Sequence, residues 1–338
     1  MRKAFRSALW IVLLSFVLGV FGGVSFASGK KVVFVDDSWN SIQMHNRIAG
    51  YILEKGYGYK PDYIFAGVVP GLTGLARGEI DVIMEIWIDN VRDWYEEEVV
   101  KNKKVIDLGE VYPDAPQGWY VPTFVIKGDP KRGIKPMAPD LKSVFDLPKY
   151  WELFKDPENP KKGRFYNAVP GWTAHAVNLK KLETYGLLEY FEPFDPGSQT
   201  ALATAIVSHY KKGKPILAYY WEPEWIMGML DMTKLEEPPY DPNRWGKDYG
   251  CGFPLSRVHI GINAKYAEKH PEIVEFLKKY ETTLAQNNAA LSFMQKNDAT
   301  VDEAALWFLR TYQDEWAKWI DDPVKVEKIK KALEEERN

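Results

Sequence analysis

Length, composition and charge exclude several classes of protein. The chain has 338 residues, 46% hydrophobic and 27% charged, which is typical of a globular protein with one large or two smaller α/β domains. Its formal net charge is −3, so the chain lacks the excess of positive charge that is typical of proteins that bind nucleic acid or an anionic membrane. The single cysteine, Cys251, excludes an internal disulfide framework and a CxxC site.

The first 27 residues have the pattern of a secretory signal peptide. A basic head precedes an apolar run over residues 8–20, and the small residues Ser25 and Ala27 follow. We predict cleavage after Ala27 and export to a periplasmic or other extracytoplasmic compartment. No cysteine follows the site, so a lipoprotein is not expected. The alternative is an uncleaved anchor helix over residues 8–27, which is only marginally long enough to span a bilayer.

From residue 31 onward, strand and helix patterns alternate. In chain order we predict a strand at 31–35, a helix at 40–56, a strand at 62–68, a helix at 70–79, a strand at 80–87, a helix at 89–102 and a strand at 118–126. A proline-rich, charged tract follows at 127–162. Beyond it we predict a strand at 164–169, helices at 174–185 and 199–212, strands at 215–220 and 257–263, and helices from residue 265 onward. Repeated strand–helix units favour an α/β fold with parallel sheets covered by helices.

Four tryptophans follow predicted strands at the positions where ligands bind in such folds. These are Trp39, Trp87, Trp172 and Trp221, and a helix is predicted directly after each. Trp87 follows Trp39 by 48 residues and Trp221 follows Trp172 by 49, so each half of the chain contributes one pair. The alternative is that each indole fills its own core, as Trp307, Trp316 and Trp319 are expected to do. For Trp39 both interpretations stay open.

Several indole faces around one cleft form a site for a cation that cannot donate hydrogen bonds. Each face attracts a cation by about 0.5–2 kcal/mol. A quaternary ammonium group matches such a site, because it is too diffuse for a carboxylate pair and too apolar for water to hold strongly.

Four segments resemble the substrate-binding proteins of ABC importers for glycine betaine, proline betaine, carnitine and choline. They are GEIDVIMEIW (78–87), VPGWTAH (169–175), YYWEPEW (219–225) and RVHIGINAKYAEKHPEIVEFL (257–277). The resemblance implies a two-domain periplasmic-binding-protein fold, type II-like, with the ligand cleft between domains joined by two crossover strands, at 118–126 and 257–263. Domain I would comprise residues 28–117 and 254–338, and domain II residues 118–253.

The resemblance also implies site residues and partners. The cage tryptophans of that family match Trp87, Trp172 and Trp221, and Trp39 resembles a cage position of the choline-binding branch. Some betaine binders have a carboxylate-binding histidine where this chain has Val91. The implied partners are a small quaternary ammonium ligand, a membrane permease and its cytoplasmic ATPase subunits, with the binding protein itself a monomer.

A carboxylate on the ligand needs donors, and the sequence offers them after Trp172. The N–H groups of Thr173 and Ala174 begin a predicted helix, and His175 is either a further donor or a solvated residue of the first turn. We therefore expect a betaine rather than choline. Asp36, Asp37 and Glu222 either add attraction for the cation or cap helices, and for Asp37 capping is favoured.

The enzyme alternative is a secreted glycoside hydrolase with Glu85 and Glu222 as the carboxylate pair. The chain has no GxSxG, HExxH or Walker motif, and its five histidines lack metal-ligand spacing. We therefore predict a binding protein that is not an enzyme and has neither a cofactor nor a metal. A choline- or carnitine-preferring binding protein stays an alternative within the same class.

Overall fold

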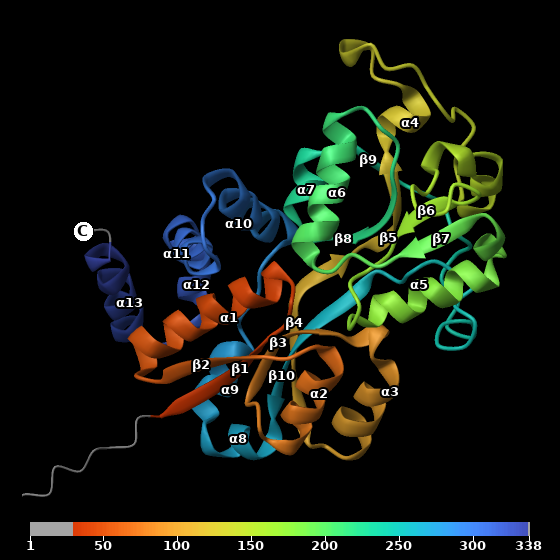
Figure 1. Cartoon of the computed structure of the whole chain (residues 1–338). Coiled ribbons are helices and arrows are strands. Elements are labelled where there is room, and N and C mark those ends of the chain that lie inside the picture. The colour runs from red at the N-terminus through yellow and green to blue at the C-terminus, as the bar shows by residue number, and fades with distance from the viewer. Residues whose placement is uncertain (1–29, 337–338) are drawn as a thin grey trace, which may run out of the picture.

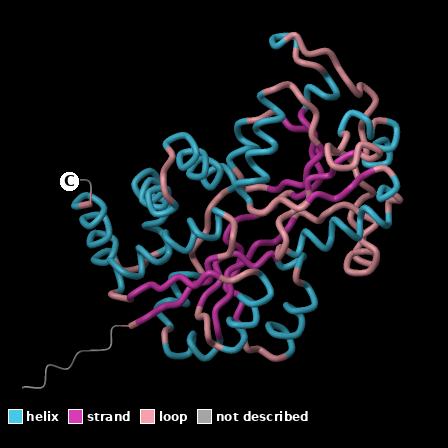
Figure 2. The backbone as a smooth tube through the Cα atoms, viewed as in Figure 1, coloured by secondary structure: helices cyan, strands magenta, loops and turns pink. Residues whose placement is uncertain are grey.

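The computed structural model describes residues 30–336, which form two lobes built on separate five-stranded sheets (Figures 1 and 2). The predicted signal peptide lies outside the described residues. Between residues 30 and 336, no helix has both the length and the apolar character needed to span a membrane.

The first sheet has the strand order β2-β1-β3-β10-β4. Its strands are β1 (Lys31–Asp36), β2 (Lys60–Phe65), β3 (Val82–Trp87), β4 (Val105–Ala115) and β10 (Ser256–Asn263). Strands β1, β2 and β3 are parallel, and β10 runs antiparallel to both β3 and β4. Strand β3 is buried along almost its whole length, as expected of a central strand covered on both faces.

The second sheet repeats this plan with the order β7-β6-β8-β5-β9. Its strands are β5 (Gln117–Pro122), β6 (Gly163–Tyr166), β7 (Phe191–Phe194), β8 (Leu217–Trp221) and β9 (Met232–Lys234). Strand β6 pairs in parallel with β7 and β8, whereas β5 is antiparallel to β8 and β9. The two-sheet α/β class predicted from the sequence is confirmed.

The chain passes between the sheets twice. It leaves the first sheet after Ala115, enters the second at Gln117, and returns to the first at Ser256. The division into domains at 117/118 and 253/254 stays a prediction, and Gln117 itself already pairs in the second sheet.

Helices cover both sheets and the junction between them (Figure 1). In the first lobe these are α1 (Asn40–Ile52), continued by a π-helical turn (Leu53–Tyr57), α2 (Val68–Arg77), α3 (Arg92–Tyr95), α8 (Ala264–Lys269) and α9 (Pro271–Leu277). A 3-10 turn (Ile88–Asn90) precedes α3, and a π-helical segment (Glu96–Lys101) continues it. The second lobe has α4 (Thr123–Lys127), α5 (Thr173–Thr184), α6 (Gln199–Lys211) and α7 (Trp225–Met229).

The C-terminal helices are α10 (Leu284–Asn297), α11 (Val301–Thr311), α12 (Gln313–Trp316) and α13 (Pro323–Glu335). The starts of α10 and α11 are fixed by local chemistry, because Thr283 with Gln286 and Thr300 with Glu303 form capping boxes. Helix α11 packs against α1, and α10 reaches α7 of the other lobe.

Three strands were missed by the sequence patterns, and all three are sheet edges. Strand β4 contains Asp107, Gly109 and Pro113, β7 contains Pro193, and β9 has only three residues. Edge strands carry charges and prolines that prevent pairing with other chains, so they lack a clean apolar alternation.

Two predictions about local structure are wrong. The predicted strand at 118–126 ends at Pro122, and Thr123 begins the short helix α4. Short apolar runs do not distinguish a buried strand from a buried helix, which explains the error. No helix follows Trp221 directly either, since α7 begins only at Trp225.

Candidate functional site

A cavity lies between the two lobes and contains about 640 Å³ of empty space, part of it open to solvent. The first lobe contributes Val35, Asp37, Trp39, Ile42, Gly67, Val68, Gly71, Leu72, Ile83, Glu85, Ile86, Trp87, Asn90 and Val91. The second sheet and its helices contribute Gln117, Trp172, Thr173, Ala174, Tyr219 and Trp221. The cavity is thus mostly apolar with a few polar groups, as small-molecule sites usually are.

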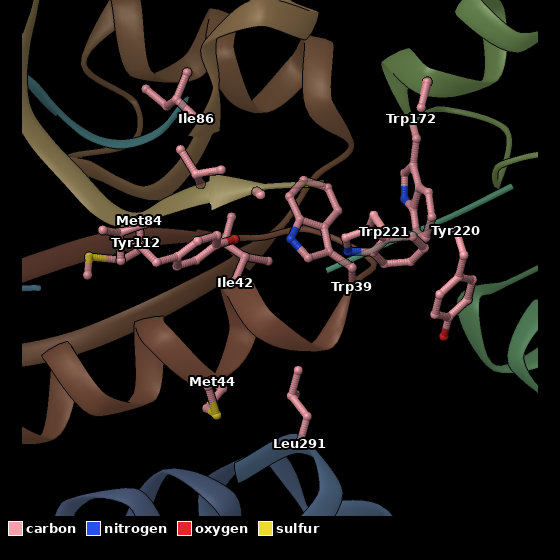
Figure 3. Packing of buried hydrophobic residues seen from close by; sticks show 14 of the residues in the cluster. Trp39, Ile42, Met44, Met84, Ile86, Tyr112, Trp172, Tyr220, Trp221 and Leu291 are labelled. Atoms are coloured by element: carbon pink, nitrogen blue, oxygen red, sulfur yellow. The ribbon is translucent and has the colours of Figure 1, made fainter. Parts of the chain in front are cut away.

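All four tryptophans predicted from the strand ends line this cavity. The ring centroids of Trp39 and Trp172 are 6.0 Å apart with an interplanar angle of 86°, although the two residues belong to different lobes. Trp172 and Trp221 are 4.7 Å apart at 85°. Figure 3 shows Trp39 reaching from the first lobe toward the indoles of Trp172 and Trp221. The ring of Trp172 therefore stands nearly perpendicular to both of the other rings.

Three of the four indoles use their N–H groups inside the protein. Trp39 Nε1 donates to Glu85 Oε2 at 2.6 Å, and Trp87 Nε1 donates to the same oxygen at 3.3 Å. Trp172 Nε1 donates to Ser38 Oγ at 2.7 Å, across the gap between the lobes. These rings therefore offer a guest their π faces and carbon edges, which suit a methylated cation.

Two buried carboxylates line the cavity together with the indoles. Burial raises the pKa of Glu85 to about 7, although hydrogen bonds to its carboxylate oppose the shift. Burial likewise raises the pKa of Asp37 to about 6, against the effect of its hydrogen bonds from Ser38. Among the described residues, no lysine, arginine or histidine lines the cavity. Its side-chain charges are therefore only negative.

The expectation that Asp37 caps the following helix is wrong. The N-cap of α1 is Trp39, and Asp37 makes no cap bond to that helix. Asp37 instead accepts from Ser38 N at 2.6 Å and faces the cavity.

The helix that follows Trp172 brings unused donors to the cavity. Thr173 and Ala174 are the first residues of α5 and line the cavity, and the N–H groups of a first helical turn have no intrahelical acceptor. Helix α2 begins at the same cavity with Gly67 and Val68. Two helix starts, each with a partial positive charge, thus face the space between the indoles.

His175, left open as either a ligand donor or a solvated residue of the first turn, pairs with an acidic side chain in the structure. Its Nε2 is 2.8 Å from Asp195 Oδ1, and it is not among the residues that line the cavity.

The other flanking carboxylates are also engaged elsewhere. Asp36 is paired with Arg47 at 2.7 Å, and Glu222 accepts from Asn288 of α10 at 3.2 Å. Neither lines the cavity. Glu85 and Glu222 therefore do not face one substrate as a hydrolase pair would. Within residues 30–336, no cluster of three or more histidine, cysteine or acidic residues could hold a metal ion.

A polar group missed by the sequence analysis lies at the entry to the second sheet. Gln117 Oε1 accepts from Tyr219 at 2.8 Å and from Asn90 at 3.3 Å, while its Nε2 donates to Ser256 at 2.6 Å. Three of these residues line the cavity. Tyr219 lies two residues before a cage tryptophan, and Asn90 lies three residues after another. This proximity was the only signal in the sequence that these residues belong to the site.

Polar contacts join the lobes around the cavity. Gln199 Oε1 of α6 accepts from Asn40 N at the start of α1 at 2.9 Å, and Trp245 Nε1 donates to Asp89 O at 2.6 Å. With the Trp172–Ser38 bond, these contacts hold the lobes together on several sides of the site.

Comparison with known proteins decides the family. The sequence model of the OpuAC family, described as the substrate binding domain of ABC-type glycine betaine transport systems, matches residues 30–311. The chain belongs to the OpuAC family. This membership implies a small-molecule ligand and ABC transporter partners, and it decides against the glycoside hydrolase, because members of the family are transport receptors and not enzymes.

Individual relatives of this OpuAC chain agree with the family. It is similar to the glycine betaine/proline betaine-binding periplasmic protein of Escherichia coli strain K12, with 25% identity over 272 residues, 76% of this chain and 79% of the relative. Its fold is similar to the glycine betaine, L-proline-binding protein of Borrelia burgdorferi, with a TM-score of 0.70, 19% identity, and coverage of 89% of this chain and 100% of the other. It is also similar to an ABC-transporter choline-binding protein in complex with choline, with a TM-score of 0.69, 21% identity, and coverage of 90% and 98%.

Proposed function

We propose that this OpuAC chain captures a quaternary ammonium compound, foremost glycine betaine or a related betaine, outside the cytoplasm and delivers it to an ABC permease and its ATPase subunits. The observation that carries the proposal is the set of four indoles, contributed by both lobes, around one cavity that has no cationic side chain. Such a site attracts a methylated cation through the ring faces and offers it no competing positive charge.

The choice of a betaine rests on the presence of both signs of charge around the cavity. Glu85 and Asp37 suit the ammonium end, whereas the free N–H groups of Thr173 and Ala174 suit a carboxylate. A zwitterion matches both ends at once. Choline is the second candidate, because Asp37 faces the cavity and Val91 offers no hydrogen bond to a carboxylate.

Calorimetric titrations with glycine betaine, proline betaine, carnitine and choline test this choice. Hydrogen bonds to a charged group contribute about 1.5–3 kcal/mol each, so two N–H donors should favour glycine betaine over choline by about a hundredfold or more. Tenfold tighter binding of choline would leave the indole cage intact and contradict the assignment of Thr173 and Ala174. Binding of none of the four would contradict the proposed function.

We also propose that the chain is exported as a monomer without a lipid anchor and that residues 1–27 are removed. The support is the basic head, the apolar run and the small residues before Ser28, together with the periplasmic location in the relative's name. The N-terminal residue of the exported chain should be Ser28, and a retained Met1 would contradict removal.

A further inference from the structure

Glu85 is a buried carboxylate directly behind the indole cage. It lies on β3, two residues before Trp87, and it lines the cavity with only 3% of its surface exposed. Its Oε2 accepts three hydrogen bonds, from Trp39 Nε1 at 2.6 Å, from Ser41 Oγ at 3.1 Å and from Trp87 Nε1 at 3.3 Å. One oxygen thus accepts hydrogen bonds from two cage rings, which lie at the carboxyl ends of β1 and β3.

The second oxygen, Oε1, makes no hydrogen bond of good geometry among the described residues, although the neutral hydroxyl of Tyr112 lies close enough to lower the pKa of Glu85. The nearest basic group is His45 Nε2 of α1, at 3.8 Å. Burial lowers the pKa of His45 to about 3, so this imidazole is neutral near pH 7 and cannot balance a carboxylate. His45 Nδ1 is already bonded to Tyr280 at 2.7 Å.

The other ionisable groups around Glu85 do not supply a positive charge either. Tyr112 of β4 and Tyr280 have pKa values raised well above their usual range by burial, so both are neutral. Asp37 and Glu224 carry the same sign as Glu85. A buried charge is costly unless it is paired, and this carboxylate has no paired cation within residues 30–336.

We propose that the cationic head of the ligand is the missing partner, so that Glu85 both positions the indoles of Trp39 and Trp87 and selects for positive charge in the guest. This inference rests on the proposed function and extends it. Indole faces already favour a cation over a neutral group of the same size, and a carboxylate behind them increases this discrimination between a quaternary nitrogen and a quaternary carbon.

The proposal couples binding to protonation. In the free protein, burial raises the pKa of Glu85 to about 7, so the carboxylate is partly protonated at neutral pH. A bound cation stabilises the ionised form and lowers this pKa, so binding releases protons. The affinity should therefore rise with pH and fall as the pH drops below about 7. Burial raises the pKa of Asp37 to about 6, so protonation of Asp37 lowers the affinity further as the pH falls toward 6. Burial and the charge of Glu85 raise the pKa of Glu224 to about 8, so Glu224 stays mostly protonated below pH 7.5.

Two substitutions separate the two roles of Glu85. Glu85→Gln keeps an oxygen that can accept from both indoles but removes the charge, whereas Glu85→Leu removes both. Glu79→Gln is the matched control, because it makes the same change of charge at an exposed position just before the same strand. Asp37→Asn isolates the contribution of the second carboxylate.

The experiment measures Kd for glycine betaine and for 3,3-dimethylbutanoate, which has a quaternary carbon in place of the nitrogen, between pH 5.5 and 7.5. Glu85→Gln should weaken glycine betaine binding by about tenfold at pH 7.5 without weakening the carbon analogue, and Asp37→Asn with Glu85→Gln should remove the pH dependence. Glu85→Leu should also shift the indole fluorescence of the free protein. Glu79→Gln should match the unmodified chain.

Equal affinities of Glu85→Gln and the unmodified chain for glycine betaine, with the same pH profile, would overturn the inference and leave the proposed function standing. No binding of glycine betaine by the unmodified chain would instead overturn the proposed function. If the variants do not fold, the proton release on binding can be measured by calorimetry of the unmodified chain in two buffers of different ionisation enthalpy. Proton release at pH 7 is expected, and no release or an uptake would contradict the inference.

Discussion

Trp221→Ala should weaken the binding of glycine betaine by at least about tenfold. The indole of Trp221 lies 4.7 Å from that of Trp172, and both line the cavity between the lobes. Its removal deletes one cation–π contact, worth about 0.5–2 kcal/mol, and opens the cage to water, and about 1.4 kcal/mol corresponds to a tenfold loss. Calorimetric Kd values for the variant and the unmodified chain measure the effect.

Trp307→Ala is the matched control for this result. Trp307 is half-buried on α11, stacked on Phe293 at 5.2 Å, and does not line the cavity. Its substitution should leave Kd unchanged. Since Trp221 also contacts Tyr219 and Tyr220, thermal melts must show that Trp221→Ala is folded at the titration temperature. Equal Kd values for all three proteins would mean that the indoles fill a core and do not hold a ligand.

Trp316→Ala should lower the free energy of unfolding by about 3–5 kcal/mol. Trp316 is completely buried on α12, and its Nε1 donates to Leu309 O at 2.7 Å, so the substitution leaves both a void and an unpaired carbonyl. Urea unfolding measures the change. Because the residue is remote from the cavity, the Kd for glycine betaine at low temperature should stay the same. A stability within about 1 kcal/mol of the unmodified chain would contradict the packing described for the C-terminal helices.

The location of the site could be predicted because the topology of the fold constrains it. Trp87 and Trp221 end strands β3 and β8, whereas Trp39 and Trp172 follow β1 and β6 after short loops. The carboxyl ends of parallel strands meet at one edge of a sheet, so residues at these four corners gather without any knowledge of side-chain packing. The two lobes then place their edges toward one another.

The direction of individual side chains could not be predicted in the same way. Asp37 and His175 are each within three residues of a cage tryptophan, yet Asp37 faces the cavity and His175 turns toward Asp195. Glu85 was considered only as one carboxylate of a hydrolase pair and not as a binding residue. Only the three donors that converge on its Oε2 place it behind the cage. The strand β4 was missed for a related reason. Its residue pattern reflects its position at the edge of the sheet, and the sequence alone does not show which strands lie at an edge.

The most direct test of the central claim, that an indole cage recognises a quaternary ammonium group, is a calorimetric titration with glycine betaine, dimethylglycine, sarcosine and glycine. The four ligands share a carboxylate and differ only in the number of methyl groups on nitrogen. Each N–H that replaces a methyl must lose its water against a ring face that offers only a weak acceptor, at a cost of about 1–3 kcal/mol. The account predicts that affinity falls at each step and is lost for glycine. Glycine binding as tightly as glycine betaine would contradict it.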